Sequence, residues 1–366
     1  MTTESGVLLH RIECVESFVN VKAGDKGGWV QNENNLSQNG NAWVYGNARV
    51  YGDARVYGDA RVYGNAWVLG KAWVLGKAQV YGDARVYVDA QVYGDARVYQ
   101  NARVYGDARV YGNARVYGDA QVYGDAQVYG NALVFGKARV YEDAWVYQNA
   151  RVYEDARVYE DAWVYRNAWV YGDARVYQNA RVYGDAQVYG NAQVYGNALV
   201  LGKAEVLGKA EVYGDAQVYG DARVYQNARV YGNIWVSQNA QVYGNAQVYG
   251  DAWVYGDAQV YGDAWVYGDA RVYGDARVYE DARVYGNAQV CSDAIISNNN
   301  DYIVFKNNWS SGRYFTWTRS NDMWRVGCFY GTGKDLIEKA YKDSKLSGDC
   351  YKAYVELVEK LKEIQK

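Results

Sequence analysis

The chain repeats every six residues from position 41 to position 292, without an insertion or a deletion. The dominant unit is Asp/Asn-Ala-Arg-Val-Tyr-Gly, as in residues 53–58. Among 42 such hexads the fourth residue is always Val, and the second is Ala everywhere except at Ile234. A fixed short period indicates a solenoid, in which each repeat buries its apolar face only against its neighbours.

The hexad fits an extended strand followed by a corner. Its second and fourth residues lie on the same side of a strand, so Ala and Val are predicted to face the core. The third and fifth residues then face solvent, and Gly followed by Asp or Asn suits a tight corner. An α-helix is excluded, because a six-residue step advances it by about 600° and carries the Val stripe off any one face.

These observations predict an all-β fold, a parallel β-helix with three hexads per coil. The 252 residues of the repeat would then form about 14 coils. We expect an N-terminal β cap at residues 1–40, the hexapeptide-repeat β-helix at residues 41–298, and a small C-terminal α+β cap at residues 299–366. Ile234 adds volume to a core sized for Ala and Val, so the sequence predicts a local bulge at residues 233–238 and a neutral or stabilising Ile234→Ala substitution.

An aliphatic residue followed four positions later by a small one, as in Val56 and Ala60, resembles the hexapeptide repeat of left-handed parallel β-helices. The Tyr after Val departs from that pattern, which usually has a small residue there. The segment VKAGDKGGWV at residues 21–30 and Asn35-Leu-Ser37 resemble YdcK-type hexapeptide-repeat proteins of bacteria and phages. The resemblance implies a left-handed coil. Members are often labelled transferases or polymer-forming proteins by fold analogy, which does not fix a function.

The two ends leave the hexad phase. Residues 8–12 and 18–21 read as strands, and residues 27–30 as a tight turn. Residues 301–305 read as a strand, and residues 313–318 and 323–329 as a hairpin. Thr332 and Asp335 predict a capping box for a helix that runs to about residue 345 and is stopped by Gly348. A second helix is expected to have one apolar face, made of Tyr351, Tyr354, Val355, Val358, Leu361 and Ile364.

Composition excludes several classes of protein. Half of the residues are apolar and 16% are aromatic, which excludes a disordered chain. No apolar stretch is long enough to span a membrane, and the first residues lack the features of a signal peptide, so we expect a cytoplasmic protein. The four cysteines form no CxxC pair, so no zinc site, disulfide framework or cofactor is expected.

Acyl transfer is the enzymatic hypothesis that the fold suggests, and that chemistry commonly needs a histidine base. The chain has one histidine, His10, which lies in the N-terminal cap and is interpreted as a cap residue. Residues 331–334, Gly-Thr-Gly-Lys, are similar to the end of a phosphate-binding loop. Asp335 follows them and would repel phosphate, so this segment is interpreted as the start of a helix.

The outward positions are the remaining candidates. Trp145 and Trp163 are 18 residues apart, as are Trp235 and Trp253, so each pair should stack on one face, either to hold a sugar or as ladder packing. Arg beside Tyr could contact glycans or nucleic acid. The hexads carry 24 Lys and Arg against 27 Asp and Glu, a balance that argues against nucleic acid.

The sequence therefore favours a non-enzymatic structural rod that serves as a scaffold or interaction surface. An acyltransferase, and a surface that binds glycans or nucleic acid through Tyr, Trp and Arg ladders, stay open as alternatives. The expected partner is an unidentified protein or glycan, with no membrane contact. Related hexads at residues 65, 131 and 197 are 11 hexads apart and fall on different faces, which argues against a site built on one face.

Overall fold

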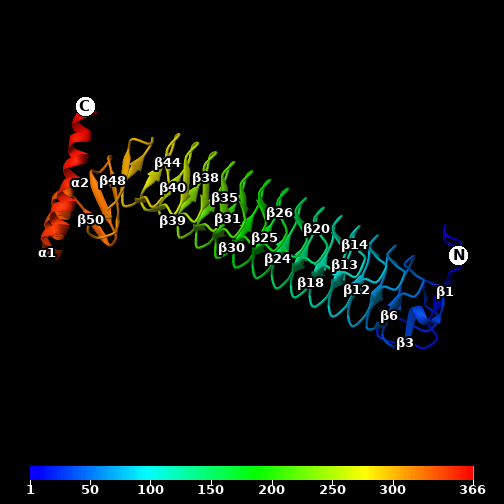
Figure 1. Ribbon diagram of the computed structural model, residues 1–366. Helices are drawn as coiled ribbons and strands as arrows, with labels where there is room; N and C mark the ends of the chain where they lie inside the picture. The colour runs from blue at the N-terminus through cyan, green and yellow to red at the C-terminus, as the bar shows by residue number, and fades with distance from the viewer. Residues whose placement is uncertain (366) are drawn as a thin grey trace. The chain divides into compact units, whose positions relative to one another are not determined.

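The computed structural model describes residues 1–365 and consists of two compact units, Met1–Gly208 and Lys209–Lys366. Each unit contains a solenoid whose strands form three parallel sheets, which confirms the predicted fold class (Figure 1). The second unit adds a four-stranded antiparallel sheet and two helices. Ten strands line one sheet of the first unit and five line the matching sheet of the second, close to the predicted number of coils.

In the first unit most strands have two residues, the third and fourth of a hexad. The first face holds β1 (His10–Glu13), β2 (Lys26–Val30), β5 (Arg49–Val50), β8 (Trp67–Val68), β11 (Arg85–Val86), β14 (Arg103–Val104), β17 (Gln121–Val122), β20 (Arg139–Val140), β23 (Arg157–Val158), β26 (Arg175–Val176) and β29 (Gln193–Val194). The second face holds β4 (Trp43–Val44), β7 (Arg61–Val62), β10 (Gln79–Val80), β13 (Arg97–Val98), β16 (Arg115–Val116), β19 (Leu133–Val134), β22 (Arg151–Val152), β25 (Trp169–Val170), β28 (Gln187–Val188) and β31 (Glu205–Val206). The third face holds β3 (Leu36–Gly40), β6 (Arg55–Gly58), β9 (Trp73–Val74), β12 (Gln91–Val92), β15 (Arg109–Val110), β18 (Gln127–Val128), β21 (Trp145–Val146), β24 (Trp163–Val164), β27 (Arg181–Val182) and β30 (Leu199–Val200).

In the second unit the hexads continue with the same six-residue period, and their strands form three sheets with fewer strands than those of the first unit. The first face holds β32 (Glu211–Tyr213), β35 (Arg229–Gly232), β38 (Gln247–Gly250), β41 (Trp265–Gly268) and β44 (Arg283–Val284). The second face holds β34 (Arg223–Val224), β37 (Gln241–Val242), β40 (Gln259–Val260), β43 (Arg277–Val278) and β46 (Ile295–Ile296). The third face holds β33 (Gln217–Val218), β36 (Trp235–Val236), β39 (Trp253–Gly256), β42 (Arg271–Gly274) and β45 (Gln289–Val290).

Strands pair in parallel with partners 18 residues away, as in Gln79↔Arg97 and Val80↔Val98. Backbone N–H groups at the third and fifth hexad positions donate to the next coil. Arg103 N donates to Ala120 O at 2.9 Å, and Tyr105 N donates to Val122 O at 3.0 Å. This register confirms three hexads per coil. Ala and Val of the hexads from residue 47 to residue 290 are fully buried, as the alternation predicts.

The corner residue at the sixth hexad position has a positive φ, whether or not it is glycine. Gly106 has φ 72°, and a Cβ there would lie 2.9 Å from the backbone nitrogen of Gly124. Gln100 and Glu154 adopt the same conformation, with φ of 61° and 60°. Their side chains accept a hydrogen bond from the next corner, Gln100 from Gly118 N and Glu154 from Gly172 N. This bond offsets part of the cost of a left-handed residue that is not glycine.

At the N-terminal end the tight turn predicted at residues 27–30 is wrong. These residues lie in β2, which pairs antiparallel with β1 and parallel with β5. A Cβ on Gly27 would lie 2.5 Å from Val44 O, and one on Gly28 would lie 2.6 Å from Ala48 O. The two glycines are therefore explained by a close approach between backbones and not by a turn. A short 3₁₀ helix, Glu33–Asn35, follows, and its capping box is formed by Asn32 and Asn35.

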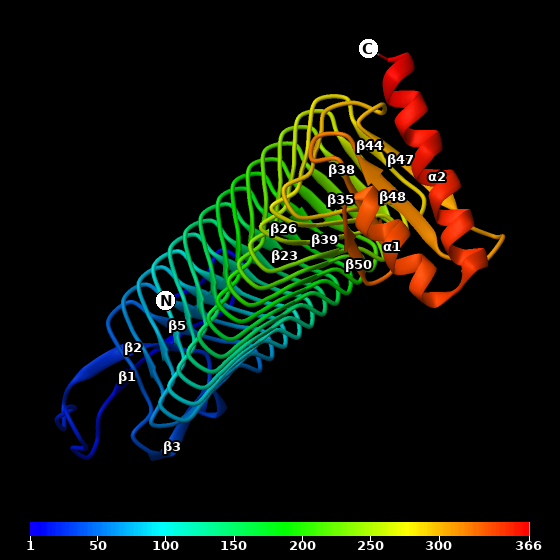
Figure 2. The same cartoon turned by 90° about the vertical axis from the view of Figure 1, so that its left-hand side faces the viewer.

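At the C-terminal end the predicted strand and hairpin form one antiparallel sheet of β47 (Tyr302–Lys306), β48 (Tyr314–Thr318), β49 (Met323–Val326) and β50 (Phe329–Gly331). Figure 2 shows helices α1 (Gly333–Asp343) and α2 (Lys345–Ile364) beside this sheet. The capping box of Thr332 and Asp335 is confirmed.

Gly348 does not stop the first helix, so that prediction is wrong. Ser344 ends α1 and caps the start of α2, which includes Gly348. A Cβ on Gly348 would clash with the Tyr341 ring, so the glycine allows the two helices to approach closely. Of the predicted apolar face of α2, Tyr351, Val355 and Val358 are buried. The prediction that Ile364 belongs to this apolar face is wrong, because the residue is 79% exposed.

The C-terminal sheet satisfies backbone donors of the last coils with side-chain oxygens. Gln289 N donates to Thr316 Oγ1 at 2.9 Å, and Ile295 N donates to Ser320 Oγ at 2.7 Å. The Arg325 guanidinium lies over the Tyr273 ring at 5.6 Å. These contacts are what a capping element needs, since an open coil presents unpaired strand edges.

The bulge predicted at residues 233–238 is absent from the strand pairing. The register continues through Gln217↔Trp235 and Trp235↔Trp253. The fully buried Ile234 is accommodated by smaller changes. The bond from Trp235 N to Ala252 O lengthens to 3.3 Å, and Gly232 opens to φ 91°. The backbone absorbs the extra volume without losing a rung of the ladder.

Ile234 is fully buried and the strand register around it is unbroken. We therefore now expect the Ile234→Ala substitution to be destabilising, and not neutral or stabilising as the sequence alone predicts. Replacing it by Ala should leave a cavity, because the neighbouring coils carry only Ala216 and Ala252 at this position. We expect Ile234→Ala to lower the free energy of unfolding by about 2 kcal/mol or more, and the control Ile234→Val by roughly 1 kcal/mol. Denaturant unfolding followed by circular dichroism measures both. An unchanged or increased stability of Ile234→Ala would show that the isoleucine is strained in place.

Truncation after Ser292 removes the oxygens that cap Gln289 and the strand that contains Ile295. The shortened chain should keep its β structure and associate end to end, because its last coil then offers an unpaired edge with nearly the same Ala and Val core as every other coil. Size-exclusion chromatography and electron microscopy compare it with the full chain at equal concentration. If the truncated chain and the full chain show the same association state, the C-terminal sheet and helices have a role other than capping.

Candidate interaction surface

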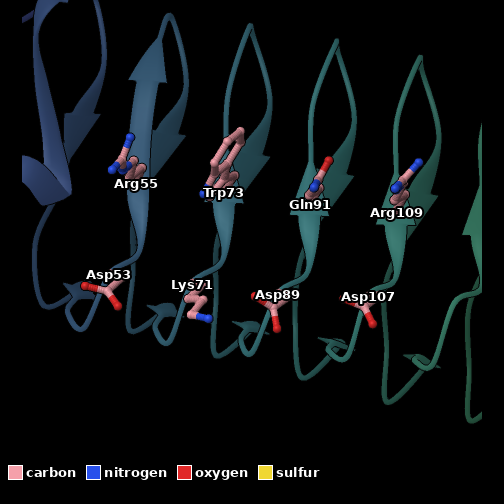
Figure 3. Close-up of a pocket in the computed structure, with 8 residues that line it drawn as sticks. All are labelled: Asp53, Arg55, Lys71, Trp73, Asp89, Gln91, Asp107 and Arg109. Carbon is pink, nitrogen blue, oxygen red and sulfur yellow. The ribbon is translucent and has the colours of Figure 1, made fainter.

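Each face of the solenoid exposes three rows of side chains that run from coil to coil. The corner row consists of the first residues of the hexads, the middle row of the third residues, and the tyrosine row of the fifth residues. In Figure 3 Asp53, Lys71, Asp89 and Asp107 form a corner row, and Arg55, Trp73, Gln91 and Arg109 form the middle row beside it. A surface on this solenoid is therefore a set of parallel rows with one side chain per coil.

An open groove lies between the corner row and the middle row on every face of the first unit. On the third face it has a volume of about 490 Å³ and is lined by the residues of Figure 3. The groove on the first face, from Asn47 to Arg85, has about 530 Å³. The groove on the second face, from Asp95 to Leu133, has about 510 Å³. The geometry is equivalent on the three faces, so chemical differences between them come from side chains alone.

The tyrosine rows are stacked columns. On the third face Tyr93, Tyr111, Tyr129, Tyr147, Tyr165 and Tyr183 have ring centroids 4.8 to 4.9 Å apart and nearly parallel planes. Several hydroxyls donate to a glutamine of a neighbouring coil, as from Tyr111 to Gln127 Oε1 at 3.2 Å. Most of the hexad tyrosines are half-buried. The columns cover the sheets and expose mainly ring edges.

The predicted tryptophan pairs do stack. Trp145 and Trp163 lie 5.1 Å apart with an angle of 3° between ring planes, and Trp235 and Trp253 lie 4.7 Å apart at 12°. The Arg181 guanidinium covers Trp163 at 4.8 Å, and Arg271 covers Trp253 at 4.8 Å. Because one face of each of these two rings meets the other tryptophan and the opposite face meets arginine, a sugar can reach only their edges. This geometry favours ladder packing, and the role of the four residues in ligand binding stays a prediction.

Asparagines in the corner rows form a hydrogen-bonded ladder. The amide of Asn113 donates to Asn131, that of Asn131 to Asn149, and that of Asn149 to Asn167, each at 3.1 Å. Asn167 donates to Asp185 at 2.9 Å. These side chains meet their hydrogen-bonding needs within the solenoid, which leaves less capacity for an external ligand.

Charge is sorted by face between residues 89 and 177. The third face has five aspartates in its corner row, Asp89, Asp107, Asp125, Asp143 and Asp161, and Arg109 is the one basic residue in its corner and middle rows over this range. The first face has Lys137 and four arginines, Arg103, Arg139, Arg157 and Arg175, against three aspartates and Glu154, which directly precedes Asp155. The second face has one aspartate, the asparagine ladder at its corner, and four arginines if the corner residue Arg166 is included, whose guanidinium lies over the Tyr183 ring of the third face. The near-neutral total thus hides an acidic third face, a basic second face and a first face that is close to neutral.

The other residues singled out from the sequence do not assemble into a reactive site. His10 is exposed on β1. Thr332 and Asp335 cap α1, so residues 331–334 begin a helix as predicted. Within residues 1–365 no group of three His, Cys, Asp or Glu side chains is arranged to hold a metal ion. Neither described helix is long and apolar enough to cross a membrane.

The comparison with protein families finds one recurring match. The model described as YdcK Beta solenoid repeat matches thirteen segments that together cover just over half of the chain. They are residues 42–58, 54–70, 90–106, 108–124, 126–142, 168–184, 192–208, 216–232, 222–238, 240–257, 258–274, 270–286 and 276–292. No curated protein matches the chain.

The stacked columns predict how the protein responds to alkali. Burial, together with the neighbouring Tyr111 and Tyr147, raises the pKa of Tyr129 to about 12. A tyrosine whose pKa is raised on folding stabilises the fold fully below pH 10, and that contribution is lost as the pH rises from 10 towards 12. We expect the free energy of unfolding to fall across this range, and tyrosinate absorbance at 295 nm to appear at higher pH than in the urea-unfolded chain. Coincident titrations of the folded and unfolded chains would contradict the prediction.

Proposed function

Because the chain belongs to the YdcK β-solenoid repeat family, we propose that it is a non-enzymatic scaffold whose stacked coils present extended rows of side chains to other molecules. The observation that supports this proposal most is how the outward side chains are used. Tyrosines stack on tyrosines, asparagines bond to asparagines, and Arg181 covers Trp163, each between adjacent coils. The hexads thus use their outward chemistry to hold one coil on the next.

The finer parts of the proposal rest on separate observations. A left-handed coil follows from the hexapeptide resemblance at Val56 and Ala60. A cytoplasmic location fits the four cysteines, Cys14, Cys291, Cys328 and Cys350, which are all free thiols. The boundaries 1–40, 41–298 and 299–366 describe where the hexads begin and end in the sequence. Within this scheme β2 and β3 extend the first and third sheets into the N-terminal cap.

Acyl transfer is the competing function that fold analogy suggests. It calls for a histidine base within hydrogen-bonding reach of the acceptor, in a site that shields the reaction from water. His10 is exposed at the N-terminal end. The grooves of the solenoid lie open to solvent and are lined by Asp, Asn, Arg, Gln and Trp. These features favour the scaffold over the transferase.

Acetyl-CoA turnover distinguishes the two functions. The full-length chain should consume acetyl-CoA no faster than buffer does, in the presence of a panel of amine and hydroxyl acceptors. The matched variant His10→Ala should behave in the same way, because the histidine supports no reaction. The release of free thiol measures the rate. Turnover by the full-length chain that His10→Ala abolishes would replace the scaffold with an acyltransferase.

A further inference from the structure

The third face between residues 89 and 165 combines an acidic row with an aromatic row. Its corner row is Asp89, Asp107, Asp125, Asp143 and Asp161, and its tyrosine row is Tyr93, Tyr111, Tyr129, Tyr147 and Tyr165. Between them lie Gln91, Arg109, Gln127, Trp145 and Trp163. The groove of Figure 3 enters this region at Asp89 and Gln91 and reaches Asp107 and Arg109.

The aromatic part of this face is a continuous wall. The five tyrosine rings follow one another at 4.8 to 4.9 Å. Tyr129 meets Trp145 edge to face at 6.3 Å, and Tyr147 meets Trp163 in the same way. Ring edges that project from such a wall can contact the flat face of another aromatic system along several coils.

The acidic row has few basic neighbours: Lys71 lies one coil before Asp89, and Arg109 lies in the middle row beside it. Among the ion pairs of the described residues, none involves these five aspartates, and all five carboxylates are exposed or half-exposed. Glu142 and Glu160 directly precede Asp143 and Asp161 at the same corner and add to the negative charge. Carboxylates one coil apart are separated by about one strand spacing, about 4.8 Å, so each feels its neighbours.

We propose that the third face between residues 89 and 165 binds an elongated, planar aromatic cation that lies along the row of coils. The tyrosine and tryptophan edges supply apolar contact over the length of the ligand, and the aspartate row supplies charge complementarity. The positive charge of such a ligand is spread over its ring system, so it does not have to be aligned with any single carboxylate. A delocalised cation can therefore be attracted by the whole regular row of aspartates. Binding of such a ligand is a function separate from the proposed scaffold function, and this proposal does not depend on that function.

A basic peptide in extended conformation fits this face less well. Side chains on the same side of a strand repeat every two residues, about 6.6 Å, whereas the aspartates repeat at about 4.8 Å. Successive lysines would therefore fall out of step with the carboxylates within a few coils. A rigid aromatic cation avoids this mismatch and loses little conformational entropy on binding.

The other two faces provide internal controls, because they share the coil geometry and the tyrosine columns. The first face has Tyr105, Tyr123, Tyr141 and Tyr159 stacked at 4.8 to 4.9 Å, beside a middle row rich in arginine. The second face has its own column beside the asparagine ladder. A ligand that recognised tyrosine columns alone would bind all three faces, whereas an aromatic cation should select the third.

Thioflavin T, a planar benzothiazolium cation, is the probe, and Congo red, a planar dianion, is its counterpart. The test variant is the triple Asp107→Asn, Asp125→Asn and Asp143→Asn of the full-length chain. Its matched control is Asp83→Asn, Asp119→Asn and Asp155→Asn, which removes the same charge from the corner row of the first face. Circular dichroism checks that both variants keep the solenoid, and equilibrium dialysis at low salt measures affinity.

We expect the third-face triple to weaken thioflavin T binding about tenfold and the first-face triple to change it less than about twofold. Added salt should weaken binding to the unaltered chain. Tyr129→Leu with Tyr147→Leu should also weaken binding, whereas Tyr123→Leu with Tyr141→Leu on the first face should not.

Three results would overturn the proposal. The first is an equal loss of thioflavin T affinity in the two aspartate triple variants. The second is a thioflavin T affinity that no aspartate substitution changes. The third is tighter binding of Congo red than of thioflavin T, with the Congo red affinity lowered by the tyrosine pair of the third face. That result would show that the aromatic wall binds without regard to charge.

Discussion

The backbone hydrogen bonds between residues 18 apart are the constraint on which the rest of this structure depends. They place every side chain directly above its equivalent in the next coil, at the spacing of strands in a sheet. Once this register is set, a tyrosine must meet a tyrosine, an asparagine must meet its equivalent, and an aspartate must lie beside an aspartate. Ladders and charged rows are therefore consequences of one backbone geometry.

The regular part of the fold could be predicted from the sequence, because period, strand alternation and corner residues all point to the same arrangement. The ends were harder to predict, because glycine has more than one structural use. Gly28 and Gly348 resemble turn or stop signals in the sequence, yet each gives room to a neighbour, Ala48 O in one case and the Tyr341 ring in the other. A contact between segments distant in the chain leaves no local signal.

The candidate surface was predicted only in part. The stacking of Trp145 on Trp163 follows from their 18-residue spacing, whereas the arginine that covers the outer ring depends on the next residue in the row, Arg181. The acidic row was overlooked because charge was summed over all hexads. The acidic row can be recognised in the sequence when charges are counted separately for each face, because its aspartates recur every 18 residues.

Parallel pairing also gives the solenoid a direction. A second chain can continue the ladder only with its strands running the same way, so that the first coil of one chain meets the last coil of another. Such a contact joins two different surfaces and leaves a free copy of each, which generates an open filament in place of a closed dimer. The antiparallel strand β1 and the Thr316 and Ser320 oxygens are therefore predicted to act against a polymerisation reaction that has no natural end point.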